Sequence, residues 1–466
     1  MKLGTTLACL SLGGLAAFLG QLNAGARPAD DGGASAGADV IVGAIPDYTK
    51  YYKGTIGGET WLSYAFGSTS CNIGTAQLEW YAAPSNRHPV IPQNLYRVKN
   101  GGFEHIGVSW VKHGFCALQQ TLCGSCTPAG GGCPSLLGVG CSDPYTASLN
   151  GSQSDLRPRY QINPSTGYYV TAQSDPTSSD PSAAKERLRV KQNDMNPSLN
   201  AGAIFYAECQ YIHPQDAEAS NSLNNASYRR VVVGADSSTG YALSFSGSTI
   251  QQLPAIYGWK DQHNDVSIKA VDVSGDGRFN IGNRAWEVSP GVWRYEYVVH
   301  NLNSDRAGYS FSVPASDNID VSNIGFARPM YHSGEPFAND MWTGVHANGA
   351  VTWTCPQTYA QNTNGAALRW ASAYTFRFDS SVAPNAVNGT ATLGLFKPGN
   401  PASATAPVFV PDTAPATPGD FNGDGIIDGI DMGILLANWG GAGGDVNGDH
   451  VTDGIDLGSL LANWGG

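Results

Sequence analysis

Carboxylate and amide side chains recur in two matching clusters near the end of the 466-residue chain, 25 residues apart. The first cluster runs from Asp420 to Asp431 and the second from Asp445 to Asp456. Each places an oxygen-bearing side chain at positions 1, 3, 5, 9 and 12 of a twelve-residue loop, with a backbone carbonyl at position 7. A hard cation such as Ca²⁺ takes six to eight oxygen ligands and is bound by loops of this spacing. The sequence therefore predicts two calcium loops.

The expected ligands are Asp420, Asn422, Asp424, Ile426, Asp428 and Asp431 in the first loop, and Asp445, Asn447, Asp449, Val451, Asp453 and Asp456 in the second. Ile426 and Val451 would contribute only their carbonyl oxygens. We expect the second site to be weaker, because His450 stands where the sharp turn normally takes glycine and Thr452 replaces the apolar Ile427. The alternative is that both clusters are ordinary acidic surface turns.

A short apolar segment follows each loop. Leu435 and Trp439, like Leu460 and Trp464, are four residues apart, which places each pair on one face of a helix. This duplicated loop and exit helix, with Asp at position 12, resembles a type I dockerin, the tandem calcium module by which secreted proteins dock onto cohesin partners. The resemblance implies attachment to a cohesin-like or other surface protein.

One departure from the dockerin pattern concerns the partner. Dockerins of cellulosomes usually carry a polar pair at loop positions 10 and 11, whereas this chain has Gly429-Ile430 and Gly454-Ile455. The apolar replacements argue against a standard cohesin as the partner.

The first 26 residues are typical of a secretory signal peptide. Lys2 precedes an apolar stretch from Leu3 to Leu19, and Ala24-Gly25-Ala26 matches a cleavage pattern. Residues 27–39 are mostly small and lack periodicity, so a flexible start is expected. No later segment is long and apolar enough for a transmembrane span. We therefore expect a secreted or surface-associated protein.

The net charge of −12 comes mainly from the predicted calcium loops. Asp420 to Asp456 contribute eight negative charges, and no Lys or Arg follows Lys397, so the rest of the chain carries about four. This distribution reflects metal ligands, and it offers no basic stripe for nucleic acid.

Eight cysteines remain after the signal peptide: Cys71, Cys116, Cys123, Cys126, Cys133, Cys141, Cys209 and Cys355. An even number in an exported chain favours disulfides, but the sequence does not fix their connectivity. The spacing between Cys116 and Cys141 also fits a tetrahedral zinc site. The expected oxidising compartment favours disulfides, and with every cysteine bridged no free thiol should remain.

The residues between the start and the tail are expected to form a β-rich body. Trp293–Val299, Tyr309–Val313 and Tyr374–Asp379 alternate aromatic or β-branched residues with polar ones, a pattern typical of half-buried antiparallel strands. The predicted fold class is mainly β, a β-sandwich-type body of one or two lobes followed by a small α-helical calcium module. The expected boundaries are a cysteine-containing lobe over 40–240, a sandwich over 241–397, a Pro-rich linker over 398–419 and the dockerin-like module over 420–466.

Candidate chemistry in the body is less specific. Polar residues that could form a site are His88, Gln93, Asn94, Arg97, Lys112, His113, Asp143, Tyr145, Arg157, Arg159 and Glu208. A glycoside hydrolase needs two carboxyl groups, which Glu208, Asp216, Glu287, Glu296, Glu335 and Asp340 could supply. Glu296 and His300 share one strand face, where a cross-strand salt bridge is expected. Asp272–Asn283 has the oxygen spacing of a calcium loop, but a Gly-rich hairpin turn explains it equally well.

Three functions follow as hypotheses. The first is a secreted calcium-binding protein whose tail attaches the β-rich body to an extracellular partner, with polysaccharide as a further candidate ligand. The second is an extracellular polysaccharide-degrading enzyme that carries a dockerin. The third is a structural or adhesive surface protein.

Overall fold

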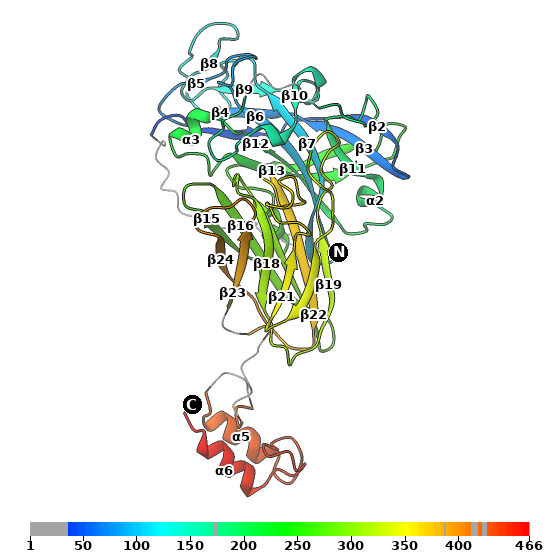
Figure 1. The fold of residues 1–466 in the computed structure, drawn as a ribbon, viewed down its shortest axis with the longest axis vertical. Coiled ribbons are helices and arrows are strands. Elements are labelled where there is room, and N and C mark those ends of the chain that lie inside the picture. The colour runs from blue at the N-terminus through cyan, green and yellow to red at the C-terminus, as the bar shows by residue number, and fades with distance from the viewer. Residues whose placement is uncertain (1–35, 171–175, 386–387, 412–417, 422–425, 466) are drawn as a thin grey trace, which may run out of the picture. The chain divides into compact units, whose positions relative to one another are not determined.

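The protein is described by a computed structural model that covers residues 36–170, 176–385, 388–411, 418–421 and 426–465 (Figure 1). Antiparallel β-sheets make up most of it, so the mainly β prediction is confirmed. The predicted signal peptide over 1–26 lies outside these residues. Within them no helix is long and apolar enough to cross a membrane.

The first half of the body is built on a nine-stranded antiparallel sheet in the order β14-β13-β12-β6-β7-β11-β3-β2, with β10 paired to β7. Its strands are β2 (Tyr48–Ile56), β3 (Glu59–Phe66), β6 (Val90–Lys99), β7 (Gly102–His113), β10 (Leu156–Arg157), β11 (Leu188–Lys191), β12 (Ile204–Gln210), β13 (Ala226–Val233) and β14 (Leu243–Ile250). Tyr64, Leu95 and Ala207, from three different strands, are buried together in its core. The inward side chains of neighbouring strands therefore meet on one face of the sheet.

Smaller elements surround this sheet. They are the three-stranded sheet β1 (Val40–Ala44), β4 (Ser68–Asn72) and β9 (Ser142–Tyr145), the pair β5 (Leu78–Glu79) and β8 (Leu136–Leu137), helices α1 (Ala147–Asn150), α2 (Gln192–Met195), α3 (Pro214–Glu218) and α4 (Tyr257–Gln262), and 3₁₀ turns at Gln153–Asp155 and Arg159–Gln161. Ala38 and Asp39, which precede β1, are buried. The expected flexible start over 27–39 is therefore wrong at its end.

Three disulfides join the cysteine-rich loops of this half: Cys71–Cys123, Cys116–Cys133 and Cys126–Cys141. The bridges involve every cysteine of the candidate zinc cluster, so the structure favours disulfides over zinc. Disulfides of this kind indicate an oxidising or extracellular environment. Cys209 and Cys355 are buried free thiols, which corrects the expectation that all eight cysteines are bridged.

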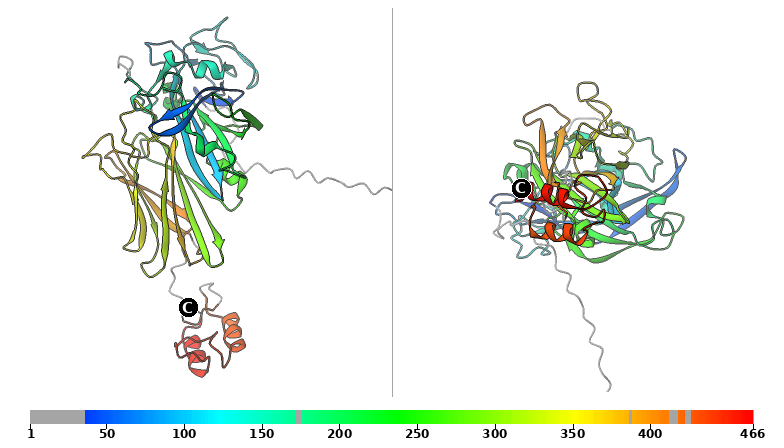
Figure 2. Two further views of the ribbon diagram at one scale, coloured as in Figure 1. Left: turned by 90° about the vertical axis from the view of Figure 1, so that its right-hand side faces the viewer. Right: turned by 90° about the horizontal axis from the view of Figure 1, so that it is seen from below.

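The second half consists of two five-stranded sheets that share one core (Figure 2). The first sheet contains β15 (Ser267–Asp272), β16 (Arg278–Ser289), β17 (Val292–Asn301), β22 (Ser372–Ser380) and β19 (Val321–Ala327); the second contains β20 (Thr343–Ala347), β21 (Ala350–Thr354), β18 (Gly308–Pro314), β23 (Gly389–Leu395) and β24 (Ser403–Val408). Tyr297 and Phe376 of the first sheet pack with Phe311 and Trp353 of the second. Aromatic contacts between the inner faces hold the two sheets together.

The alternating sequence patterns correspond to strands of this half. The segments predicted from aromatic alternation lie in β17, β18 and β22. In β22 the residues Tyr374, Phe376 and Phe378 are all buried. The three segments are confirmed as strands, but the expected half-burial is wrong for β17 and β22, because one face of each packs in the shared core and the other packs against the first half of the body.

Two expected boundaries differ from the structure. β14 pairs with β13, so the first sheet extends past the boundary expected at residue 240. β24 lies inside the expected linker 398–419, and its residues Ala404, Ala406 and Val408 are buried in the second core. The proline content of this segment concealed a strand, since Pro407 lies in an edge strand, where a missing N–H is tolerated.

Hydrogen bonds connect the two halves of the body along β7 and β22. His105 Nδ1 accepts from the amide of Ala373 at 3.1 Å, and Thr375 Oγ1 donates to the carbonyl of Phe103 at 2.6 Å. All four residues are buried. Water is therefore excluded from both of these hydrogen bonds.

The tail contains two helices, α5 (Gly429–Ala437) and α6 (Gly454–Ala462), which lie side by side (Figures 1 and 2). Ile427, Leu435 and Leu460 are its fully buried apolar residues. Trp439 and Trp464 follow the helix ends and are about half exposed. The expected Leu–Trp helical faces are therefore wrong, because Asn438 and Asn463 cap each helix before its tryptophan.

Candidate metal centre

The second predicted calcium loop is held in shape by hydrogen bonds from backbone amides to its first carboxylate. Asp445 Oδ1 accepts from Gly448 N at 2.7 Å and Asp449 N at 3.2 Å, and Oδ2 accepts from His450 N at 2.6 Å. One side chain therefore fixes the turn between loop positions 1 and 6.

The last carboxylate of the loop joins its two ends. Asp456 Oδ1 accepts from Val446 N at 2.8 Å and Asn447 N at 3.2 Å, while Oδ2 accepts from Asp453 N at 2.7 Å. These bonds, with that from Asp453 first, lower the pKa of the buried Asp456 carboxyl. Asp453 in turn accepts from Ile455 N, which completes a capping box at the start of α6.

The first loop repeats these contacts 25 residues earlier. Asp431 accepts from Phe421 N at 2.8 Å and from Asp428 N at 3.0 Å, and Asp428 accepts from Ile430 N at 2.7 Å. Each bond has its counterpart in the second loop. Asn422 and Asp424 lie outside the described residues. The shared frame shows that the sequence repeat is also a structural repeat.

The carboxylates in this structure are engaged by amides instead of meeting at one point. Asp449 Oδ1 accepts from Val451 N and its Oδ2 from Asn447 Nδ2. Across the described ranges, no three His, Cys, Asp or Glu side chains gather as a metal ion requires. The side chains of the loop carry the oxygen ligands that Ca²⁺ prefers. Because these oxygens now accept hydrogen bonds from amides, the side chains would have to rotate before they could coordinate an ion.

The two positions expected to weaken the second site behave differently. His450 has φ of 72°, so a side chain does occupy the left-handed conformation that favours glycine. Thr452 is buried, and its hydroxyl accepts from Gly444 N at 2.9 Å. Because that hydrogen bond compensates the buried hydroxyl, the expected weakness now depends on His450 alone.

Eight apolar side chains among the described residues of the tail are exposed, and the sequence did not predict them as one surface. They form four pairs, each 25 residues apart: Ile426 with Val451, Ile430 with Ile455, Leu436 with Leu461, and Trp439 with Trp464. All are between 46% and 61% exposed. The repeat itself was the signal that could have found them, since equivalent positions of two matching halves share their exposure.

Four of the polar candidates in the body form one buried network. Asn94 Nδ2 donates to Glu208 Oε1 at 2.8 Å, and Arg159 Nη2 donates to Asn94 Oδ1 at 2.9 Å and to the Gln93 carbonyl at 3.0 Å. Burial would raise the pKa of Glu208, but the nearby His300 imidazole, 3.9 Å away, and the hydrogen bonds from Ala255 N and Asn94 Nδ2 lower it to about 2. Every donor of this network is used inside the protein, so it connects strands.

The other polar candidates separate into smaller groups. His88 Nε2 accepts from His113 Nδ1 at 2.8 Å and from Tyr169 OH at 2.6 Å, and burial lowers the pKa of His88 to about 4. The remaining candidates have partners elsewhere: Lys112 with Asp155, Arg97 with Asn200 and Asp194, Asp143 with Leu118 N, and Tyr145 with Trp80, while Arg157 lies in β10. The structure therefore does not bring these residues into one site.

The candidate acids are likewise held by separate partners. Glu335 accepts from the amides of Arg159 and Tyr160, and burial raises its pKa to about 7. Glu296 accepts from Phe103 N at 2.7 Å, whereas His300 Nε2 lies 3.9 Å from Glu208. Among the described residues Glu296 therefore forms no cross-strand salt bridge, and His300 on the same face lies beside Glu208 of β12, because this face of β17 contacts the first half of the body.

Three further acids complete this set. Asp216 accepts from Val40 N at 2.8 Å, and burial raises its pKa to about 8. Glu287 is exposed and accepts from Gly291 N, and Asp340 is exposed. No contact joins any two of the six acids in the described part of the chain.

The segment Asp272–Asn283 is a hairpin between β15 and β16. Asp272 pairs with Arg278 at 2.6 Å, and Asp276 accepts from the amide of Asp305 at 2.9 Å. Asn283 lies within β16 and accepts from Phe409 N. These partners favour the hairpin turn over a calcium loop.

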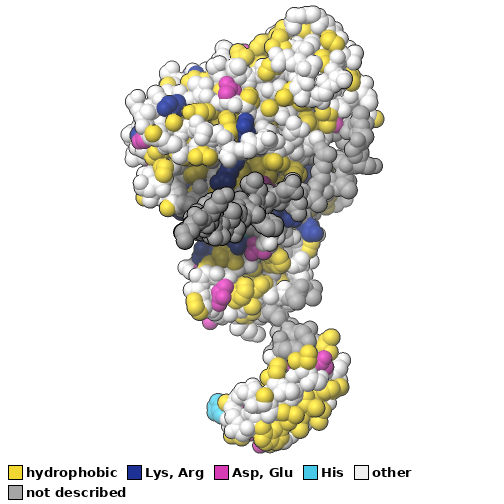
Figure 3. All heavy atoms as spheres, turned by 180° about the vertical axis from the view of Figure 1, so that it is seen from behind, with side chains coloured by type: hydrophobic (Ala, Val, Ile, Leu, Met, Phe, Trp, Pro, Cys, Tyr) yellow, Lys and Arg dark blue, Asp and Glu magenta, His cyan; other side chains and the backbone are white. Residues whose placement is uncertain are grey.

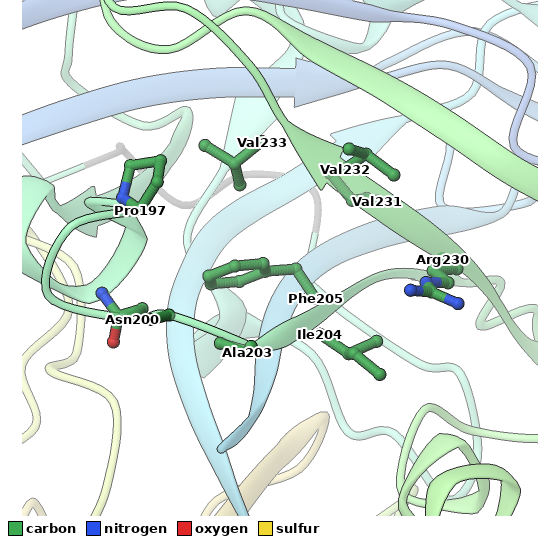
Figure 4. Close-up of a pocket in the computed structure, with 11 residues that line it drawn as sticks. Pro197, Asn200, Ala203, Ile204, Phe205, Arg230, Val231, Val232 and Val233 are labelled. Atoms are coloured by element: carbon green, nitrogen blue, oxygen red, sulfur yellow. The ribbon is translucent and has the colours of Figure 1, made fainter. Parts of the chain in front are cut away.

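A pocket of about 210 Å³ lies beside β12 and β13 (Figure 4). Phe205, Ile204 and Val231 contribute apolar walls, Asn200 a polar group, and Arg230 the charge. The residues that line it include no carboxyl group. It therefore lacks the acid pair expected of a glycoside hydrolase.

No protein-family model matches the chain, and no curated protein matches it.

Proposed function

We propose that residues 420–466 form a calcium-dependent docking module that attaches the β-rich body to an extracellular or cell-surface protein. The observation that carries the proposal is the repeated hydrogen-bond frame, in which Asp431 and Asp456 each bind the same amides of their own loop. Surface turns have no reason to share such a frame at a fixed interval of 25 residues. The resemblance to a type I dockerin supports the same reading.

The oxygen atoms of the two loops would hold one Ca²⁺ each. The proposed side-chain ligands are Asp420, Asn422, Asp424, Asp428 and Asp431, then Asp445, Asn447, Asp449, Asp453 and Asp456, with the carbonyls of Ile426 and Val451. Two calcium ions would offset four of the eight negative charges of the tail. The like charges that oppose folding would thereby be reduced.

The exposed apolar pairs supply the docking surface in this proposal. Hydrophobic side chains gather on the face of the tail that Figure 3 shows, whereas on the body they are scattered among polar atoms. Ile430 and Ile455 stand where dockerins usually carry polar residues, and both are about 60% exposed. The proposed partner is a protein with an apolar surface bordered by basic residues, because the tail would remain acidic with calcium bound.

The test uses the full chain and a purified partner. Extracellular proteins that bind the immobilised chain in calcium are identified, produced separately and titrated against it. The wild type should bind in CaCl₂ and lose binding in chelator, and Ile430→Ser with Ile455→Ser should weaken binding at least tenfold. Val232→Ser, at an exposed apolar position of the body, is the matched control. A calcium-dependent dimer of the chain itself, seen by analytical ultracentrifugation, would overturn the choice of occupant.

The body is the cargo of the module in this proposal. Polysaccharide binding and hydrolysis by the body are tested together by measuring retention on insoluble polysaccharides and release of reducing sugar. Retention without release indicates a binding protein, release indicates an enzyme, and neither outcome indicates a structural role.

A further inference from the structure

A cluster of oxygen-bearing side chains is buried where β1 begins. Asp216 of α3 accepts from Val40 N and from Asn225 Nδ2, both at 2.8 Å. Asn224 Nδ2 contacts both carboxylate oxygens of Asp39, at 3.2 and 3.3 Å. Asp39, Asp216 and Asn225 are completely buried, and the two carboxylates are close enough to interact electrostatically. Two acids and two amides therefore share one interior region.

Two oxygens of this cluster have no hydrogen-bond donor. The Oδ1 atoms of Asn224 and Asn225 are buried and without a partner. Each belongs to the amide whose nitrogen contacts one of the carboxylates, so the unpaired oxygens border the two acids. A buried acceptor without a donor is unfavourable and calls for an explanation such as an ion.

Positive charge is also missing at Asp216. The groups that act on its carboxyl are Asn225, the amide of Val40 and the like charge of Asp39, none of them cationic. A buried carboxylate normally pairs with a cation or coordinates a metal. The cluster has the kinds of group that a hard cation binds, namely carboxylates and amide oxygens, and three of its four residues are fully buried.

We propose that Asp39, Asp216, Asn224 and Asn225 bind a third calcium ion, in the body of the protein. The ion would receive the lone pairs of the two unpaired amide oxygens and the negative charge of the carboxylates. It would tie the segment before β1 to α3 and to the loop before β13, which are distant in sequence. The site shares no residue with the tail and does not depend on the docking module.

The first experiment removes the tail sites from the full chain. Asp420→Ala, Asp431→Ala, Asp445→Ala and Asp456→Ala are combined, and bound calcium is counted by equilibrium dialysis after chelator treatment. We expect one calcium per chain, against three in the wild type. No calcium in the combined variant would overturn the body site. One calcium in both proteins would instead contradict the tail sites and leave the body site supported.

The second experiment assigns the remaining ion. Asp216→Asn, added to the combined variant, should abolish binding, and Asn224→Ala should weaken it at least tenfold. Asp143→Asn is the matched control, because Asp143 is a buried carboxyl of the same half that accepts from Leu118 N. Circular dichroism establishes that each variant is folded, and the milder Asn224→Ala remains informative if Asp216→Asn does not fold. Calcium retained at full affinity in Asn224→Ala and Asp216→Asn would overturn the assignment.

Discussion

Ile427 and Thr452 occupy the same position in the two halves of the tail, and each accepts a hydrogen bond from a glycine that follows the helix of the other half. Gly465 N donates to the Ile427 carbonyl, and Gly440 N donates to the Thr452 carbonyl, both at 2.9 Å. Both side chains are buried. Each loop is therefore closed by the opposite repeat, and the two repeats form one cooperative unit.

The tail should fold only when calcium is present. Eight carboxylates in 47 residues repel one another, and the buried apolar core is small. A fragment of residues 417–466 should gain helical circular dichroism on addition of CaCl₂ and lose it in chelator. A spectrum that ignores both additions would contradict the calcium assignment.

The two calcium sites should differ in affinity because of one backbone conformation. His450 has φ of 72°, and relief of a left-handed non-glycine residue is worth about 1 kcal/mol. His450→Gly should therefore tighten the second site by about fivefold when measured by calorimetry. Asp424→Ala should reduce total calcium affinity more than Asp449→Ala. Equal calcium affinities of the two sites in the wild type would show that the predicted ranking is wrong.

Thiol titration of the mature protein, from which the predicted signal peptide with Cys9 is absent, should find two reactive cysteines in the denatured, unreduced protein and eight after reduction. The first two are Cys209 and Cys355, which are buried and free. Metal analysis should find no stoichiometric zinc. Cys116→Ser with Cys133→Ser should lower the free energy of unfolding by about 2–4 kcal/mol, because the bridge restricts the unfolded chain. One zinc per chain would contradict the three observed bridges.

Glu335 should make the body less stable as the pH rises. Burial raises its pKa to about 7 from an ordinary value near 4.5, so the folded state retains a proton that the unfolded state has lost. Its stabilising contribution is complete below about pH 4.5 and is lost as the pH rises through about 7. The midpoint temperature of thermal unfolding should fall less steeply between pH 5 and 8 in Glu335→Gln than in the wild type.

The control for this pH effect is Glu287→Gln. Glu287 is exposed and accepts a single amide hydrogen bond from Gly291. Substitution of Glu287 should leave the pH dependence of the unfolding midpoint temperature unchanged. A Glu335→Gln profile that also parallels the wild type would show that another group is responsible.

The sequence predicted those strands whose side chains alternate clearly between large apolar and polar residues. Aromatic alternation located β17, β18 and β22, because every second side chain of a half-buried strand must face the core. The small residues of β24 gave a weaker alternation, interrupted by Pro407, and the strand was mistaken for a linker. Pairing of β14 with β13 depends on contacts that no local pattern encodes.

The candidate sites also differ in whether their residues are close together in the sequence. Asp445 and Asp456 could be predicted to belong to one loop because they lie within twelve residues. Asn94, Arg159 and Glu208 were named as polar candidates, but their meeting depends on β6 and β12 pairing across more than 100 residues. Sequence spacing cannot show such convergence, and it cannot show which polar residues the fold buries.

The hydrogen bonds between the two repeats also make the first loop depend on a residue that follows the second helix. Loss of Gly465 would remove the hydrogen-bond donor to the Ile427 carbonyl, which lies nearly 40 residues earlier in the sequence. The loop at Ile427 would lose this contact directly, and the second repeat would be affected through the core that the two repeats share. Under the proposed docking function, a cut just before Gly465 would thus weaken the attachment of the body to its partner.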